Sequence, residues 1–343
     1  MKKLLNVLYV TAPDTYLSLD GENIVVKKEE NVAMRVPLHN LENVICFGYS
    51  GASPALMGAC AERNIGLCFL SPSGRFHARV IGKVKGNVLL RKKQYLISEN
   101  EAESVKIAAS FLVGKISNSR KVIERALRDH ALLVDVKTLT DTSASLKEIM
   151  RAVNSCKTTD DLMGFEGSAA KIYFSVFDQL ILQQRDAFYF KERSRRPPLD
   201  NLNAILSFLY TILTSEVASA LETVGLDPYV GFLHQDRPGR PSLALDLMEE
   251  LRSFFVDRLA LSLINRKQIT GKGFVQKESR GVIMDDDTRK KVLTVWQERK
   301  KEQITHPFLT ERIDFGLIPY VQALLLARFL RGDLDAYPPY FWN

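Results

Sequence analysis

The feature that most constrains the fold is a change in the spacing of apolar residues near residue 98. Before it, short segments alternate polar and apolar residues, as half-buried strands do, and YLSLDGENIVV predicts a hairpin about Asp20-Gly21. After it, apolar residues recur every three to four positions, as in the stripe from Val105, which predicts helices. We expect an α+β protein with a β-rich N-terminal domain, residues 1–97, and a larger, mostly α-helical C-terminal domain, residues 98–343.

Individual elements can be predicted from the same patterns. SPALMGACAERN indicates one helix within the β-rich domain, and GFVQKESRGVIM indicates a short β excursion within the helical one. No apolar run reaches ~18 residues, so we expect no membrane-spanning helix and no membrane partner. Helices are predicted at about 101–131, 140–155, 160–192, 200–224, 242–265, 287–303 and 315–331.

Charge and cysteine usage narrow the class of protein. The net charge is +7, and Lys and Arg gather in clusters such as Arg193, Arg195 and Arg196, which makes a nucleic acid the leading partner class. The four cysteines lack the paired spacing of zinc sites, so we expect free thiols in a reducing cytoplasm.

The segment GLDPYVGFLHQDRPGRPSLALDLMEELR joins a basic loop to an acidic helix. The loop contains His234, and the helix carries Asp246, Glu249 and Glu250 on the side opposite its apolar arc. Two interpretations are open, a solvated helix face or half of a metal site whose remaining ligand lies elsewhere. These residues alone favour the solvated face.

Glu166, in MGFEGSAAKIYF, is the acid whose surroundings are most unusual. Its helical stripe holds small and aromatic residues, including Tyr173, which predicts a packed face and a partly buried carboxylate. A buried charge needs a basic partner, a raised pKa or a metal ion. Gly164 and Gly167 flank it, and glycines inside a helix indicate close approach by another element.

Glu166, His234 and Glu249 together form a mixed carboxylate and imidazole set, with Asp246 nearby. Such a set suits Mg²⁺ or Mn²⁺, and in a basic protein it would act on a phosphodiester. These three residues come from two separated segments and match no regular motif, so their spacing gives the metal-site interpretation only weak support. Two further residues are candidates for flanking phosphate contacts: Arg237 and Arg240.

These segments resemble the CRISPR-associated adaptation endonuclease/integrase family, the larger subunit of the complex that inserts new spacers. The match runs nearly end to end. Lys115 and Asn118, in GKISNSRKVIERAL, look like a further family element. The most specific segments are MGFEGSAAKIYF, RRPPLDNLNAILSFLYTIL, DPYVGFLHQDRPGRPSLALDLMEELR and the closing RFLRGDLDAYPPYFW.

The resemblance implies a site and an assembly. The family's metal ligands fall on Glu166, His234 and Glu249, its second acid falls on Asp246, and Glu250 is expected to be solvated. It implies a homodimer formed through the N-terminal domain, a small ferredoxin-like adaptation subunit as partner, and a cytoplasmic location. Expected contacts to double-stranded DNA are Lys115, Tyr173, Arg237 and Arg240.

The resemblance also implies an activity. The protein would be a metal-dependent DNA endonuclease/integrase that joins the 3′-OH ends of a short foreign DNA to the CRISPR repeat by transesterification. One alternative is a stand-alone metal-dependent nuclease acting on branched or repair DNA. Another is a non-catalytic DNA-binding scaffold whose acids form only a solvated face.

Overall fold

The computed structural model describes residues 6–12, 14–29, 31–48, 50–72, 76–83 and 88–342. It contains two compact units. The first takes its described residues from 1–85, 284–303 and 314–317, and the second from 86–283, 304–313 and 318–343.

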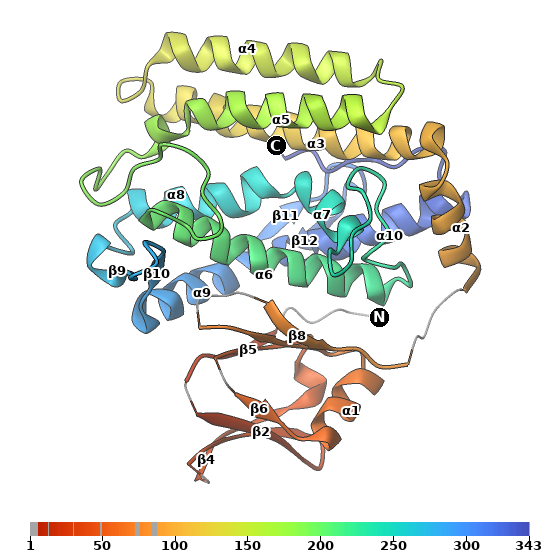
Figure 1. Ribbon diagram of the computed structural model, residues 1–343, viewed down its shortest axis with the longest axis vertical. Helices are drawn as coiled ribbons and strands as arrows, with labels where there is room; N and C mark the ends of the chain where they lie inside the picture. Colours follow the sequence, from red (N-terminus) through yellow and green to blue (C-terminus); the bar gives the residue numbers. More distant parts are fainter. Residues whose placement is uncertain are drawn as a thin grey trace. The chain divides into compact units, whose positions relative to one another are not determined.

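Two four-stranded sheets form the framework of the first unit (Figure 1). One has the order β1-β5-β7-β8, with β8 antiparallel to three parallel strands, and the other has the order β4-β3-β2-β6. Pairing of Asp20 with Asn23 confirms the predicted hairpin. The strands are β1 (Val7–Val10), β2 (Thr15–Asp20), β3 (Asn23–Lys28), β4 (Asn31–Pro37), β5 (Asn43–Phe47), β6 (Gly51–Ala52), β7 (Gly66–Leu70) and β8 (Phe76–Val80).

Helix α1 (Pro54–Glu62) packs into the same unit, as its sequence predicts. Ser53 caps it by accepting a hydrogen bond from the Leu56 amide. Leu56 joins a buried core with Leu17 of β2 and Val44 of β5. All four cysteines of the chain are free, and burial raises the pKa of the Cys46 thiol to about 12, which keeps it protonated.

Helix α9 (Asp286–Lys300) also belongs to the first unit, whereas the sequence placed everything after residue 98 in the helical domain. The Arg289 guanidinium explains this placement, because it donates to the Pro72 carbonyl at 2.7 Å and lies over the Phe47 ring. The short 3-10 turn η5 (Phe315–Leu317) accompanies α9. Contacts between residues that are distant in sequence therefore decide to which unit a helix belongs. The spacing of apolar residues does not reveal such contacts.

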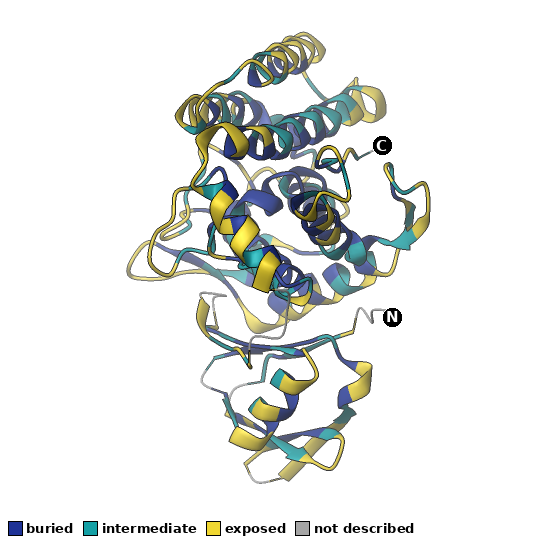
Figure 2. Ribbon diagram, turned by 90° about the vertical axis from the view of Figure 1, so that its right-hand side faces the viewer, coloured by how far each residue is buried: buried dark blue, intermediate teal, exposed yellow. Residues whose placement is uncertain are grey.

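The second unit is mostly helical, and α3, α4 and α5 lie side by side within it (Figure 1). Figure 2 shows that its outer helices have buried and exposed sides. Its helices are α2 (Val88–Ser98), α3 (Glu101–His130), α4 (Val136–Val153), α5 (Thr159–Ser175), α6 (Asn201–Thr223), α7 (Ser242–Glu249), α8 (Arg258–Asn265) and α10 (Ile318–Arg331). Short strand pairs are β9 (Phe274–Gln276) with β10 (Val282–Met284), and β11 (Gln303–Thr305) with β12 (Arg312–Asp314).

Two predicted helices are shorter than their patterns suggest. The helix expected over 160–192 ends at Ser175, because the Asp178 carboxylate accepts the Phe190 amide at 2.7 Å and holds the chain folded back. The helix expected over 242–265 is interrupted by a π-helical turn, η3 (Arg252–Asp257), between α7 and α8. Such turns change which residues face a site, and they often occur at functional sites.

Helix α6 contradicts the expectation that no segment is long and apolar enough to span a membrane. An 18-residue window within it reaches a mean hydropathy of 1.6. However, 72% of that window is buried inside the protein, so α6 occupies the position of a core helix.

Candidate active site

A cavity of about 830 Å³ lies within the helical unit, lined from α3, α4, α5, α6, α7, η3 and two loops. It brings together residues that are distant in sequence. Arg237 is exposed and is not among the lining residues, and Asp246 is buried behind them. Six of the predicted residues line the cavity: Lys115, Glu166, Tyr173, His234, Arg240 and Glu249.

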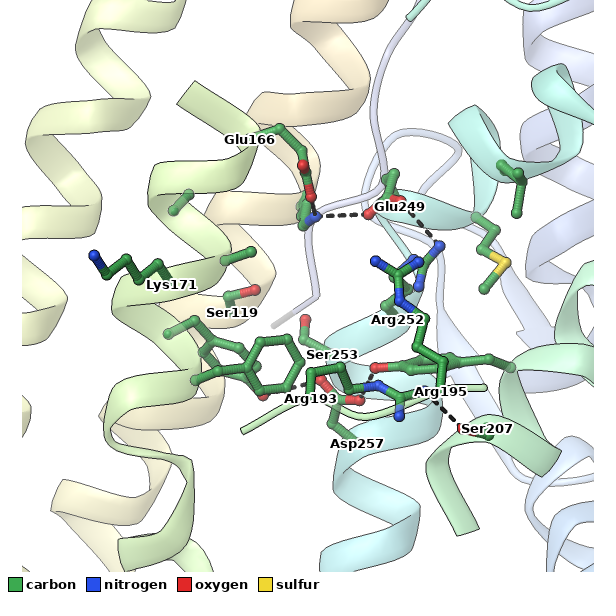
Figure 3. Close-up of a pocket in the computed structure, with 18 of the residues that line it drawn as sticks. Ser119, Glu166, Lys171, Arg193, Arg195, Ser207, Glu249, Arg252, Ser253 and Asp257 are labelled. Carbon is green, nitrogen blue, oxygen red and sulfur yellow. Dashed lines mark hydrogen bonds and ion pairs between the residues drawn. The ribbon is translucent and has the colours of Figure 1, made fainter. Parts of the chain in front are cut away.

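A lysine lies between the two glutamates predicted to be ligands. Glu166 on α5 and Glu249 at the end of α7 point toward each other (Figure 3), and Lys115 on α3 contacts both. Lys115 Nζ donates to Glu166 Oε1 in a short hydrogen bond and lies 2.8 Å from Glu249 Oε2. Burial disfavours charge on Lys115, but the two carboxylates outweigh it and raise its pKa.

Glu249 has a second basic neighbour. Its Oε1 lies 3.0 Å from the Arg252 guanidinium, and its side chain is only 4% exposed. Burial alone would raise the pKa of Glu249, but Arg252 and Lys115 hold it well below its ordinary value. Glu249 is therefore an ionised carboxylate at neutral pH, which is the form that binds a metal ion.

Asp246 fixes the conformation of the loop that carries His234. It is fully buried and accepts the backbone amides of Phe232, Leu233 and His234 at 2.6, 2.9 and 3.0 Å. Its Oδ1 also lies 2.6 Å from His234 Nδ1. With Nδ1 held in this way, Nε2 is the nitrogen that His234 can offer to a ligand in the cavity. Asp246 therefore contributes to the site by holding the His234 imidazole in position.

The acidic side of α7 and η3 is buried, so the solvated face that the sequence favoured is wrong. Glu250, expected to be solvated, is fully buried and accepts from the Tyr337 hydroxyl at 2.5 Å and the Tyr340 amide at 2.7 Å. Asn118 donates to the carbonyls of Glu250 and Tyr340 at 2.7 and 2.8 Å. Residues 337–342, the C-terminal strap, are thus fastened to the end of α7 next to Glu249. The buried members of that side are Asp246, Glu249, Glu250, Ser253 and Asp257.

The donor set fits a divalent cation once the lysine ammonium moves aside. Among the described residues, no three His, Cys, Asp or Glu side chains are grouped closely enough to hold a metal ion. Lys115 lies between the two glutamates. Yet Glu249 Oε2 is buried and accepts no hydrogen bond of good geometry. Two carboxylates and an imidazole at one cavity are ligands that Mg²⁺ or Mn²⁺ accepts.

The glycines beside Glu166 do not mark a close approach. A Cβ built at Gly164 or Gly167 would meet no atom within 4 Å, so the expectation that another element packs there is wrong. Gly164 and Gly167 instead lie on an exposed part of α5.

Comparison with known proteins identifies the family. The model of the family described as CRISPR associated protein Cas1 matches residues 8–298. The chain belongs to the Cas1 family. It is 54% identical to a CRISPR-associated endonuclease Cas1 of Rhodospirillum rubrum and 48% identical to one of Chlorobaculum tepidum, and both matches cover 100% of each chain.

Solved structures show the Cas1 fold. The Cas1 protein of Thermotoga maritima aligns over 97% of this chain and 99% of its own, with a TM-score of 0.82 and 22% identity. A casposase bound to an integration product aligns over 98% and 94%, with a TM-score of 0.84 and 20% identity. The predicted α+β class, with a β-rich start followed by helices, is therefore confirmed.

The site also contains an acid, Asp257, to which the sequence assigned no role. Asp257 is 1% exposed and accepts the hydroxyls of Tyr173, at 3.1 Å, and of Tyr210, in a short hydrogen bond. Burial raises its pKa to about 7, although the tyrosine hydroxyls, Arg252 and Arg193 oppose the shift. The hydroxyl of Tyr173, an expected DNA contact, is thus already engaged within the protein.

Two arginines surround the ring of Tyr210. The guanidinium carbon of Arg252 lies 4.9 Å and that of Arg193 lies 5.3 Å from the ring centre. Arg193 is also anchored by Asn203 Oδ1 at 2.6 Å and Ser207 Oγ at 3.0 Å. Its basic cluster was visible in the sequence, whereas nothing there indicated Tyr210.

Proposed function

We propose that this chain is a metal-dependent DNA endonuclease/integrase of CRISPR adaptation. It joins the 3′-OH ends of a short foreign DNA to the CRISPR repeat by transesterification. The observation that carries the proposal is the convergence of Glu166, His234 and Glu249 from three separate segments at one cavity with basic walls. The relatives named CRISPR-associated endonuclease Cas1, and the casposase fold, support the same class of reaction.

Each residue of the site has a separate role in this proposal. Glu166, Glu249 and the Nε2 of His234 would hold Mg²⁺ or Mn²⁺, and Asp246 keeps the imidazole oriented. When bound, the cation neutralises charge on the phosphodiester and favours attack by an oxygen nucleophile. Arg195 and Arg240 line the cavity and would bind flanking phosphates.

The chemical step conserves the number of phosphodiester bonds. The 3′-oxygen of the incoming DNA forms a bond to phosphorus and gives up its proton. The bond from phosphorus to the 3′-oxygen of the repeat strand breaks, and that oxygen takes up a proton. With water as nucleophile the same site would hydrolyse DNA.

The assembly is part of the proposal. We expect a cytoplasmic homodimer formed through the N-terminal domain, a small ferredoxin-like adaptation subunit as partner, and double-stranded DNA from the foreign fragment and the repeat. A structure described as a Cas6-RT-Cas1–Cas2 complex supports assembly into a complex, since it aligns over 98% of this chain, with a TM-score of 0.82 and 25% identity. This chain spans 36% of that longer protein.

A reconstituted reaction tests the proposal. The protein and its small partner are incubated with a repeat-containing plasmid, a short duplex and Mn²⁺, and joined product is measured. Glu166→Ala should lower joining at least about 100-fold, whereas Glu148→Ala, an exposed glutamate on α4 paired with Arg151, should leave it unchanged. Full joining by Glu166→Ala would refute the site.

Two other outcomes separate the alternatives. Strand cleavage without joined product would favour a stand-alone nuclease. Metal binding that is equal in wild type and His234→Ala, measured by calorimetry, would favour a non-catalytic scaffold.

A further inference from the structure

Lys115 occupies the place where a cation shared by Glu166 and Glu249 would lie. Its ammonium is 2.8 Å from Glu249 Oε2 and bonded to Glu166 Oε1, on the facing oxygens of both acids. A divalent cation binds carboxylate oxygens at about 2.1 Å. It cannot contact the same two oxygens while Nζ remains between them.

The charges already balance without a metal ion. Glu166 and Glu249 face Lys115 and Arg252, two carboxylates against two cations, in a pocket where the side chains of Lys115 and Glu249 are 13% and 4% exposed. Arg195 and Arg240 add positive charge to the lining. A divalent cation added to this arrangement would meet like charge at short range and low dielectric.

The lysine is able to leave. Its ammonium is at the end of a flexible four-carbon stem, and the cavity beside it measures about 830 Å³. Arg252 has less freedom, since its guanidinium also lies over the Tyr210 ring.

We propose that Lys115 is a built-in counter-ion that holds the Glu166–Glu249 pair together and must be displaced when the divalent cation binds. This inference rests on the proposed function, because it takes these glutamates as metal ligands. It assigns Lys115 a role in setting metal affinity, in addition to the DNA contact expected from the sequence. The displaced ammonium stays in the cavity, where it can donate a hydrogen bond to a phosphate oxygen.

Titration of the DNA-free protein with Mn²⁺, followed by calorimetry at one fixed pH, tests the proposal. Lys115→Met and Lys115→Gln remove the competing charge, so both should bind Mn²⁺ at least tenfold more tightly, equivalent to ~1.4 kcal/mol. Lys115→Arg keeps the charge and should bind no more tightly than wild type. Lys171→Met is the matched control: Lys171 lines the same cavity but points away from the glutamates (Figure 3), so affinity should not change.

Thermal unfolding provides a second readout. Without metal, Lys115→Met should melt below wild type, because the two carboxylates lose their shared partner, and Mn²⁺ should raise its melting temperature more than that of wild type. Lys115→Gln retains a hydrogen-bond donor and serves if the methionine variant does not fold.

The outcomes distinguish this proposal from the function on which it rests. If Glu166→Ala abolishes Mn²⁺ binding but both neutral Lys115 variants bind no more tightly than wild type, the counter-ion role is refuted and the metal site stands. If Glu166→Ala binds Mn²⁺ as wild type does, the metal site itself is refuted, and the counter-ion role with it.

Discussion

Replacing the buried Asp257 by asparagine should change how the stability of the protein depends on pH. Asp257 is enclosed by the hydroxyls of Tyr173 and Tyr210, and burial raises its pKa from 3.8 to about 7. A protonated Asp257 is therefore favoured in the folded state relative to the unfolded chain. Asparagine has the same shape and does not ionise in this range.

The size of this pH dependence follows from the pKa of Asp257 in the unfolded chain, 3.8, and in the folded protein, about 7. Stability associated with Asp257 is fully present below pH 3.8 and is lost as pH rises through about 7. At about 1.4 kcal/mol per pH unit, the loss totals about 4 kcal/mol, of which about 3 kcal/mol falls between pH 5 and pH 8. The unfolding free energy of wild type minus that of Asp257→Asn should therefore fall by about 3 kcal/mol over this interval, whatever its value at pH 5.

Urea unfolding followed by circular dichroism at several pH values provides the measurement. Asp141→Asn, at an exposed aspartate of α4 paired with Lys137, is the control, and its difference from wild type should stay constant. Parallel curves for wild type and Asp257→Asn would refute the reasoning. A difference that grows with pH would show that Arg252 and Arg193 keep Asp257 ionised.

Four further variants test residues in and around the site, and the stability of each is measured by thermal unfolding. Gly164→Ala should stabilise the protein by up to about 1 kcal/mol, because the added Cβ meets nothing within 4 Å, whereas Gly231→Ala should destabilise it, since its Cβ would lie 2.8 Å from Asp246 Oδ2 and 3.0 Å from a backbone oxygen. Asp246→Ala should cost at least about 3 kcal/mol by leaving three loop amides without their acceptor, and should weaken Mn²⁺ binding. Tyr337→Phe should cost about 1–3 kcal/mol by removing a donor to buried Glu250. Equal stability of any variant and wild type would contradict its prediction.

Much of the fold could be predicted from local patterns, because those patterns report which face of each element is buried. The hairpin about Asp20-Gly21, helix α3 and the β9–β10 excursion were predicted within a few residues. Features that depend on distant partners were not. The turn after Ser175 depends on the hydrogen bond between Asp178 and the amide of Phe190, twelve residues later. The placement of α9 depends on Arg289 and a carbonyl more than two hundred residues away.

The site shows the same limit. Sequence pattern and family resemblance predicted that Glu166, His234 and Glu249 belong together, and the cavity brings them together. The pattern could not show that the acids beside them are buried, since charge spacing on a helix is the same for a solvated face and for a network. Nor could it show that Lys115 joins the two glutamates or that Asp257 pairs with two tyrosines, because these partners come from separate helices.

The C-terminal strap has a consequence for the timing of synthesis. Glu250 takes a hydrogen bond from an amide 90 residues later, and Asn118 is joined to Tyr340 and Trp342, which follow it by 222 and 224 residues. At roughly 5–20 residues per second, the ribosome needs on the order of 10–45 s to supply those partners to α3. Until residue 342 has been made, the end of α7 lacks its final fastening. The buried carboxylate of Glu250, next to Glu249, therefore lacks its Tyr337 and Tyr340 donors while the chain is still being made.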